Sequence, residues 1–93
     1  MVIGVCTADL YLPTTQSLKD KRRIIKSIIE KIRAKFNVSI SEVDYQDQWG
    51  KATLGIAIVT TDSAYAQQVL NAATKIIDQN SEAEIYNLSV EIL

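Results

Sequence analysis

VIGVCTADLYLPTTQSLKDKRRIIKSIIEKIRAKF, residues 2–36, decides the fold because its hydrophobic period changes once along the stretch. In residues 2–12 small and apolar side chains alternate with more polar ones, which is the period of two that a β-strand has. A proline then ends the strand. From Ser17 to about Phe36 the apolar residues recur with the period of an amphipathic helix, and Ser17 with Asp20 forms a weak capping box.

A helical wheel divides this helix into a core face and two outer flanks. The residues on the expected core face are Leu18, Ile25, Ile28, Ile29, Ile32 and Phe36. Ile24 falls on an outer flank together with Lys31 and Lys35. Asn37 is the expected C-cap.

Two further strands are predicted after the helix, in residues 38–46 and 51–60, and a tight connection at Asp47–Gly50 would join them as a β-hairpin. The second strand alternates cleanly. The first changes phase midway, so we expect a β-bulge near Ser41 and Glu42.

The remaining chain predicts a second helix over residues 63–79, capped by Asp62 and ended by Asn80, and a last strand over residues 83–93. The order βαββαβ favours a single α+β domain, residues 1–93, with a ferredoxin-like sandwich. Both helices would cover one face of a four-stranded antiparallel sheet. The opposite, mixed face would hold Thr7, Asp9, Tyr11, Thr53, Gly55, Ala57, Asn87, Ser89 and Glu91, flanked by Ile3, Val5, Val59 and Ile85.

The composition is that of a globular protein, with 47% apolar and 23% charged residues in 93. Cys6 is the only cysteine, which favours a reducing cytoplasm and a buried structural thiol. There is no histidine, which removes the commonest general base and zinc ligand. The N-terminus leads directly into a strand, so we expect no signal peptide, and no apolar run is long enough to span a membrane.

Eight of the ten basic residues lie between Lys19 and Lys35, against only Asp20 and Glu30. The rest of the chain is acidic, because the net charge of the whole is −1. Such a run usually forms a solvated helix face. Here few acids compensate it, and four basic residues crowd a helix start, where the macrodipole opposes them.

We therefore expect one flank of this helix to bind an anionic partner. The residues expected to contact phosphates are Lys19, Arg22, Arg23, Lys26 and Arg33, with Lys21 and the first helical amides assisting. Charge spread along the helix suits a polyanion better than one small phosphate.

Other chemistry has less support. Glu42, Asp44 and Asp47 would form either a magnesium or acid–base site or an ordinary polar hairpin, and we favour the hairpin. Acylphosphatases share the fold but use an arginine in the first β–α loop, and Pro13–Gln16 contains none. Only Tyr11 is placed to stack on an RNA base. Trp49 and Tyr45 indicate either a contact patch or a local cluster over the core edge.

The segments LPTTQSLKDKRRIIKSIIEKIRAKFNVSISEVDYQDQW (residues 12–49) and ATLGIAIVTTD (residues 52–62) resemble the YlxP-like family of small bacterial proteins, a domain of unknown function. The resemblance covers nearly the whole chain. It implies a ferredoxin-like fold and a link to translation or ribosome maturation, and it implies no catalytic residues.

The sequence thus leads to two hypotheses. The first is a non-enzymatic, cofactor-free module that binds structured RNA, namely ribosomal RNA or a ribosomal subunit, through the basic helix. The alternative is a homo-oligomeric protein–protein interaction module that pairs through the open sheet face or an edge strand. An enzyme acting on small phosphorylated substrates has little support beyond the helix N-terminus.

Overall fold

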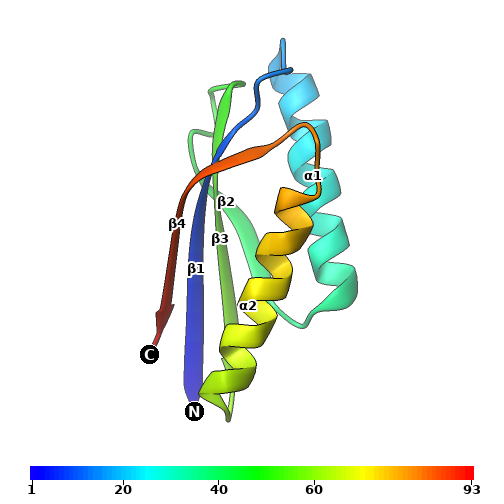
Figure 1. Cartoon of the computed structure of the whole chain (residues 1–93). Coiled ribbons are helices and arrows are strands. Elements are labelled where there is room, and N and C mark those ends of the chain that lie inside the picture. Colours follow the sequence, from blue (N-terminus) through cyan, green and yellow to red (C-terminus); the bar gives the residue numbers. More distant parts are fainter.

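The computed structural model describes residues 1–93 and confirms the predicted order of elements (Figure 1). The elements are β1 (Val2–Tyr11), α1 (Leu18–Lys35), β2 (Ser39–Asp44), β3 (Lys51–Thr60), α2 (Ser63–Asp78) and β4 (Glu84–Ile92). The strands form one antiparallel sheet in the order β2-β3-β1-β4. This is the expected ferredoxin-like topology, and β2 and β4 are its edges.

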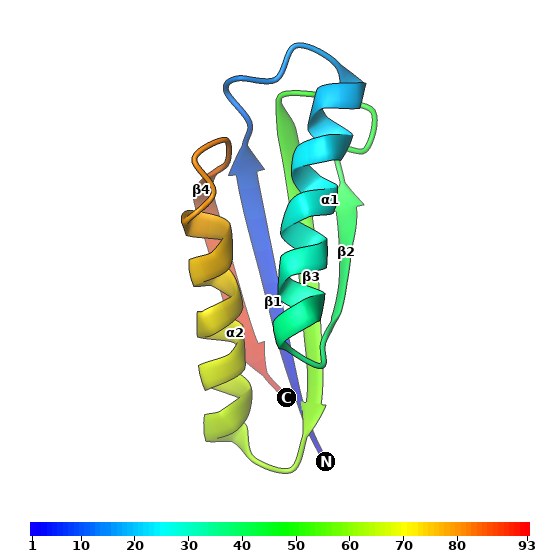
Figure 2. The ribbon, with the colours of Figure 1, turned by 90° about the vertical axis from the view of Figure 1, so that its right-hand side faces the viewer.

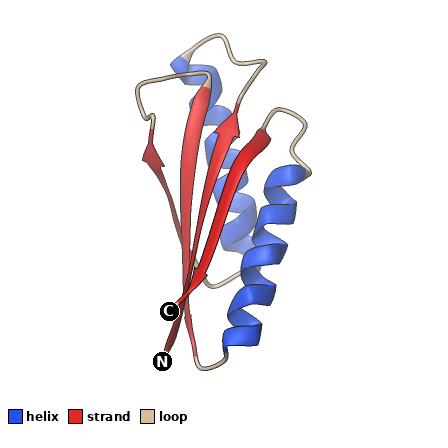
Figure 3. Cartoon of the chain, turned by 60° about the vertical axis from the view of Figure 1, so that its left-hand side comes forward, coloured by secondary structure: helices blue, strands red, loops and turns tan.

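Both helices cover the same face of the sheet and lie side by side (Figure 2). α2 packs on β1, β3 and β4, and α1 packs beside it along β2. The other face carries no helix (Figure 3). Neither helix is both long and apolar enough to cross a lipid bilayer.

The core lies between the helices and the sheet, and alternate residues of β1 point into it. Cys6, Ala8 and Leu10 are fully buried, as the period of two predicts. Burial raises the pKa of the Cys6 thiol because it disfavours the thiolate. The face of α2 that meets the sheet is also as predicted, with Ala66 and Leu70 fully buried.

The helix starts follow the sequence signals closely, and the helix ends do so less well. The Ser17 hydroxyl accepts a hydrogen bond from the Asp20 amide at 3.1 Å, and Asp62 caps α2 in the same way. The predicted C-cap Asn37 is wrong, because Phe36 already adopts an extended conformation with φ −133°. The helix therefore ends at Lys35, one residue earlier, and Phe36 packs against the core from its extended position.

The wheel was wrong about one residue of α1. Ile24 is only 1% exposed and belongs to the core, not to an outer flank. The reason is that α1 turns Lys21, Ile24 and Ile28 toward the interior. A helical wheel that counts only apolar residues does not place a lysine on the core face, so it centred that face elsewhere.

Each edge strand contains an irregularity. In β2 the register shifts between Glu42 and Asp44, just past the predicted bulge at Ser41 and Glu42. The connection that follows runs from Tyr45 to Gly50 and is longer than the predicted tight turn.

In β4 the register against β1 shifts between Asp9 and Leu10, which the sequence reasoning did not predict. The partner of Leu10 is Ile85, so Ile85 lies on the core side of the sheet and not on the open face. Tyr86 is the extra residue, and it turns to the open face instead.

Candidate nucleic-acid interface

A groove between α1 and the edge strand β2 gathers three of the predicted phosphate-binding residues. Arg22, Lys26 and Arg33 line it, and its volume is about 400 Å³. All three side chains are exposed, because they lie on the outer side of α1. Successive members are about one and two helical turns apart. Two carboxylates, Glu30 and Glu42, also line the groove. Glu42 is paired with Lys21, so three cations and one further carboxylate lie beside the unpaired edge of β2.

Arg22, Lys26 and Arg33 make few contacts within the protein, so most of their positive charge is available to a ligand. One Arg33 N–H donates to the backbone carbonyl of Ile40 at 3.0 Å, which ties the side chain to β2 and leaves its other N–H donors unused by the protein. The Lys26 ammonium lies 4.0 Å from a Glu30 carboxylate oxygen, and both side chains are well exposed. Such a surface pair is weak and screened by salt. Lys19 is exposed at the start of the same flank.

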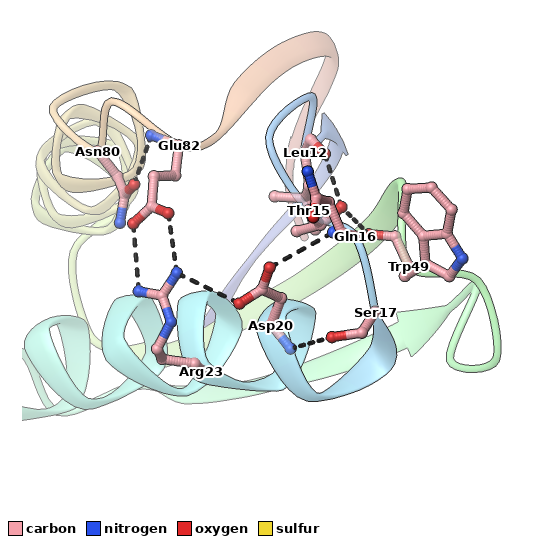
Figure 4. Close-up of polar contacts among 9 residues, drawn as sticks. All are labelled: Leu12, Thr15, Gln16, Ser17, Asp20, Arg23, Trp49, Asn80 and Glu82. Atoms are coloured by element: carbon pink, nitrogen blue, oxygen red, sulfur yellow. Dashed lines mark hydrogen bonds and ion pairs between the residues drawn. The ribbon is translucent and has the colours of Figure 1, made fainter.

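Arg23, also predicted on this flank, is held by acidic residues. Its guanidinium makes two hydrogen bonds to the Glu82 carboxylate, at 2.9 and 3.3 Å, and lies 3.9 Å from Asp20 (Figure 4). The hydrogen bond from Arg23 lowers the pKa of Glu82 and in turn raises that of Arg23. Arg23 therefore links α1 to the connection before β4.

Lys21 is not a phosphate contact, because its side chain is buried with 1% exposure. Its ammonium lies 2.7 Å from a Glu42 carboxylate oxygen and donates to the backbone carbonyls of Tyr45 and Gln48. Tyr45 has a left-handed backbone with φ 62°, which aims its carbonyl within reach of the lysine. Lys21 thus anchors the β2–β3 connection to α1.

The start of α1 is also used internally. The Asp20 amide donates a hydrogen bond to the Ser17 hydroxyl, and the Asp20 carboxylate accepts one from the Gln16 amide at 3.4 Å. Thr15 donates its hydroxyl to the carbonyls of Leu12 and Trp49, which joins this loop to the β2–β3 connection (Figure 4). A carboxylate at the helix start opposes a phosphate there, so the expected assistance from the helix N-terminus is not supported.

The acidic cluster of the hairpin separates in the structure. Glu42 pairs with Lys21 of α1, whereas Asp44 accepts from the Tyr45 amide and is the strand partner of Thr53, which bonds Asp9 on the open face. No group of three or more histidine, cysteine, aspartate or glutamate residues is arranged to hold a metal ion. The polar-hairpin interpretation fits this arrangement.

The helix-free face holds a second candidate surface at the end where β1 finishes (Figure 3). The Tyr11 and Tyr86 rings stack with their centroids 4.1 Å apart, and each residue is about 40% exposed. The Lys51 ammonium lies 5.6 to 6.0 Å from the ring centroids of Tyr11, Tyr45 and Tyr86. These distances are typical of cation–π contacts.

A fixed carboxylate borders the tyrosines. Asp9 accepts hydrogen bonds from the Thr53 hydroxyl at 2.6 Å and from the Asn87 side-chain amide at 3.1 Å, one on each oxygen. Burial and the Asp9 charge raise the pKa of Tyr86, because both disfavour the phenolate. We call this surface the tyrosine end; its residues are Asp9, Tyr11, Asp44, Tyr45, Lys51, Glu84, Tyr86 and Asn87.

The sequence reasoning placed only Tyr11 there because it assumed unbroken alternation along the last strand. The apolar residues Ile85, Leu88 and Val90 contain a phase break, which was the available signal for a bulge. Trp49 stands nearby, half exposed, and lines a shallow hollow with Tyr11 and Lys51. Its exposure does not fit a cluster over the core edge.

Comparison with known proteins agrees with the resemblance noted in the sequence. The family described as "Protein of unknown function (DUF503)" matches residues 3–90. The "Uncharacterized protein YlxP" of Bacillus subtilis (strain 168) is 36% identical over 83 residues, which cover 89% of this chain and 90% of that protein.

Solved structures resemble the fold at low sequence identity. The structural genomics protein YJCS superposes with a TM-score of 0.63 at 13% identity, covering 96% of each chain. The designed protein LFR1 1, described as having a ferredoxin fold, gives 0.54 at 14% identity, covering 100% of this chain and 83% of that one. These likenesses establish the fold alone.

Proposed function

The chain belongs to the DUF503 family of unknown function, and for this member we propose a non-enzymatic cytoplasmic module that binds structured RNA, ribosomal RNA in particular. The observation that carries the proposal is the groove in which Arg22, Lys26 and Arg33 stand in a row beside β2. The RNA backbone would lie along this groove, with Lys19 at one end.

The spacing of these basic residues along α1 suits a ligand with several phosphates better than one with a single phosphate. Lys19 and Arg33 are separated by 14 positions, which is roughly 21 Å at the rise of an α-helix. The lysines act as point charges, while the guanidinium groups can take two phosphate oxygens each. Phosphate contacts set position and affinity but carry no sequence information. We therefore expect recognition of RNA shape and charge without strong sequence preference.

The test is a salt series of binding to small ribosomal subunits and to purified ribosomal RNA. Four phosphate contacts predict a slope of log affinity against log salt of roughly −3. The variant Arg22→Glu/Lys26→Glu should weaken binding by more than about tenfold and reduce that slope by about half.

The matched control is Lys31→Glu/Lys35→Glu on the opposite flank of α1. It makes the same change in net charge with equally exposed side chains. If both double variants weakened binding equally, the loss would be due to overall charge, and the groove would have no role. If neither changed affinity or slope, the proposal would be wrong.

A second candidate function is self-association through the open face. Its support is Val59, which lies 66% exposed on β3, together with the exposed Val43 on the neighbouring edge strand. A second copy that covered these side chains would remove apolar surface from water. Light scattering over a concentration series should then give a dimer for the natural chain and a monomer for Val59→Lys. A monomer at every concentration would exclude this function.

A further inference from the structure

We propose that the tyrosine end of the open sheet face binds arginine side chains of a basic protein segment. This surface is separate from the α1 groove, because it lies on the opposite face of the sheet (Figure 3). The two surfaces share no residue, so neither proposal depends on the other.

The tyrosine end carries net negative charge, which favours a cationic partner. Asp9 faces the tyrosines, and the register places two more acidic residues on the same side: Asp44 opposite Thr53, and Glu84 opposite Tyr11. Lys51 is the one cation of the tyrosine end. A nucleic acid strand would meet net negative charge here, whereas a basic segment would meet complementary charge.

The geometry favours arginine in particular. Asp9 is held in place by Thr53 and Asn87, and its oxygens keep lone pairs for a further donor. Beside it stand the side chains of Tyr11 and Tyr86, each about 40% exposed. A guanidinium stacks on aromatic rings and pairs with a carboxylate at the same time, which an ammonium does less well.

The tyrosine rings already hold one cation, the ammonium of Lys51. Its ammonium is within 6.0 Å of three tyrosine centroids, so the cluster holds one cation of this chain. Three carboxylates lie on the same side of the sheet as that single ammonium, so the tyrosine end keeps net negative charge for a second cation. An extended basic segment, laid across the open face, would supply it.

The test is an NMR titration of the whole chain with a short peptide of alternating arginine and glycine. The side-chain amide of Asn87 and the backbone amides of Tyr11 and Tyr86 are the reporters. We expect saturable shifts there, and weaker binding of a lysine–glycine peptide of equal length. Tyr86→Ala should weaken arginine-peptide binding about fivefold, from the loss of a cation–π contact.

Tyr65→Ala is the matched control, because Tyr65 is half exposed on α2 and outside this face. It should leave the peptide affinity unchanged. Glu84→Gln is a second variant that leaves the tyrosines in place, since the Glu84 side chain is exposed and makes no hydrogen bond or ion pair within the chain. It should lower the affinity and its salt dependence.

Three results would overturn the proposal. The first is equal weakening by Tyr65→Ala, and the second is equal binding of the lysine peptide. The third is a titration in which single-stranded oligouridylate shifts the Asn87 signals and the arginine peptide does not, which would make this face a base-stacking surface. Arg22→Glu/Lys26→Glu should not weaken peptide binding, so failure here and failure of RNA binding are distinguishable.

Discussion

At the scale of single residues, the most consequential finding is the burial of Lys21. We predict that Lys21→Met lowers the free energy of unfolding by roughly 3 kcal/mol, because it leaves the Glu42 carboxylate without its partner charge. The carbonyls of Tyr45 and Gln48 lose their donor as well. Urea denaturation of the variant and the natural chain measures this loss.

Lys19→Met is the control, because Lys19 precedes Lys21 by two positions and is exposed. Its effect should stay within about 0.5 kcal/mol. Adding Glu42→Gln to Lys21→Met should recover part of the loss, since it removes the unpaired charge. Equal effects of the two methionine variants would mean that the buried pair contributes nothing to stability.

At the scale of elements, α2 approaches β1 closely at Gly4. A Cβ built there would lie 3.0 Å from side-chain carbons of Ile58 and Leu70, and 3.3 Å from the Cβ of Ala66. The Ala66 Cβ cannot move without moving α2. We therefore predict that Gly4→Ala destabilises the fold by about 1–3 kcal/mol through overpacking. Thermal or urea denaturation provides the measurement.

Gly50→Ala makes the same chemical change where a new Cβ meets nothing within 4 Å. Its effect should be within about 0.5 kcal/mol. A loss of equal size at both glycines would point to backbone entropy or strand propensity, not to the spacing between α2 and β1.

At the scale of the whole molecule, the Arg23–Glu82 pair joins α1 to the connection that leads into β4. Arg23 lowers the pKa of Glu82 below its ordinary value of 4.5, so the pair stabilises the fold fully above that pH. The contribution disappears as the pH falls through the folded-state pKa. We predict that Glu82→Gln is less stable than the natural chain at neutral pH, and that the difference vanishes in acid.

Urea denaturation of both proteins over a pH series checks this prediction. Glu84→Gln is the matched control, because Glu84 is exposed and two positions away. It should not reproduce the pH dependence of Glu82→Gln. A difference between Glu82→Gln and the natural chain that persisted at the lowest pH would mean that the side chain acts by packing and not by charge.

The sequence by itself determined the order of elements, the caps at the helix starts and the alternation in β1 and β3. These follow from hydrophobic period and from local hydrogen bonds, which involve residues a few positions apart. The sequence also showed which segments resemble the family, residues 12–49 and 52–62, but not what their residues do. In the structure Lys21 and Glu42, which both lie in the segment 12–49, form an ion pair.

Only the tertiary structure decided which basic residues face solvent and which tyrosines meet. Lys21 is buried because Glu42 and two carbonyls lie opposite it, and Arg23 is paired because Glu82 reaches it from 59 positions away. Tyr86 joins Tyr11 because the pairing of β4 with β1 shifts by one residue. Each depends on contacts between distant segments, whose register and partners no local period encodes.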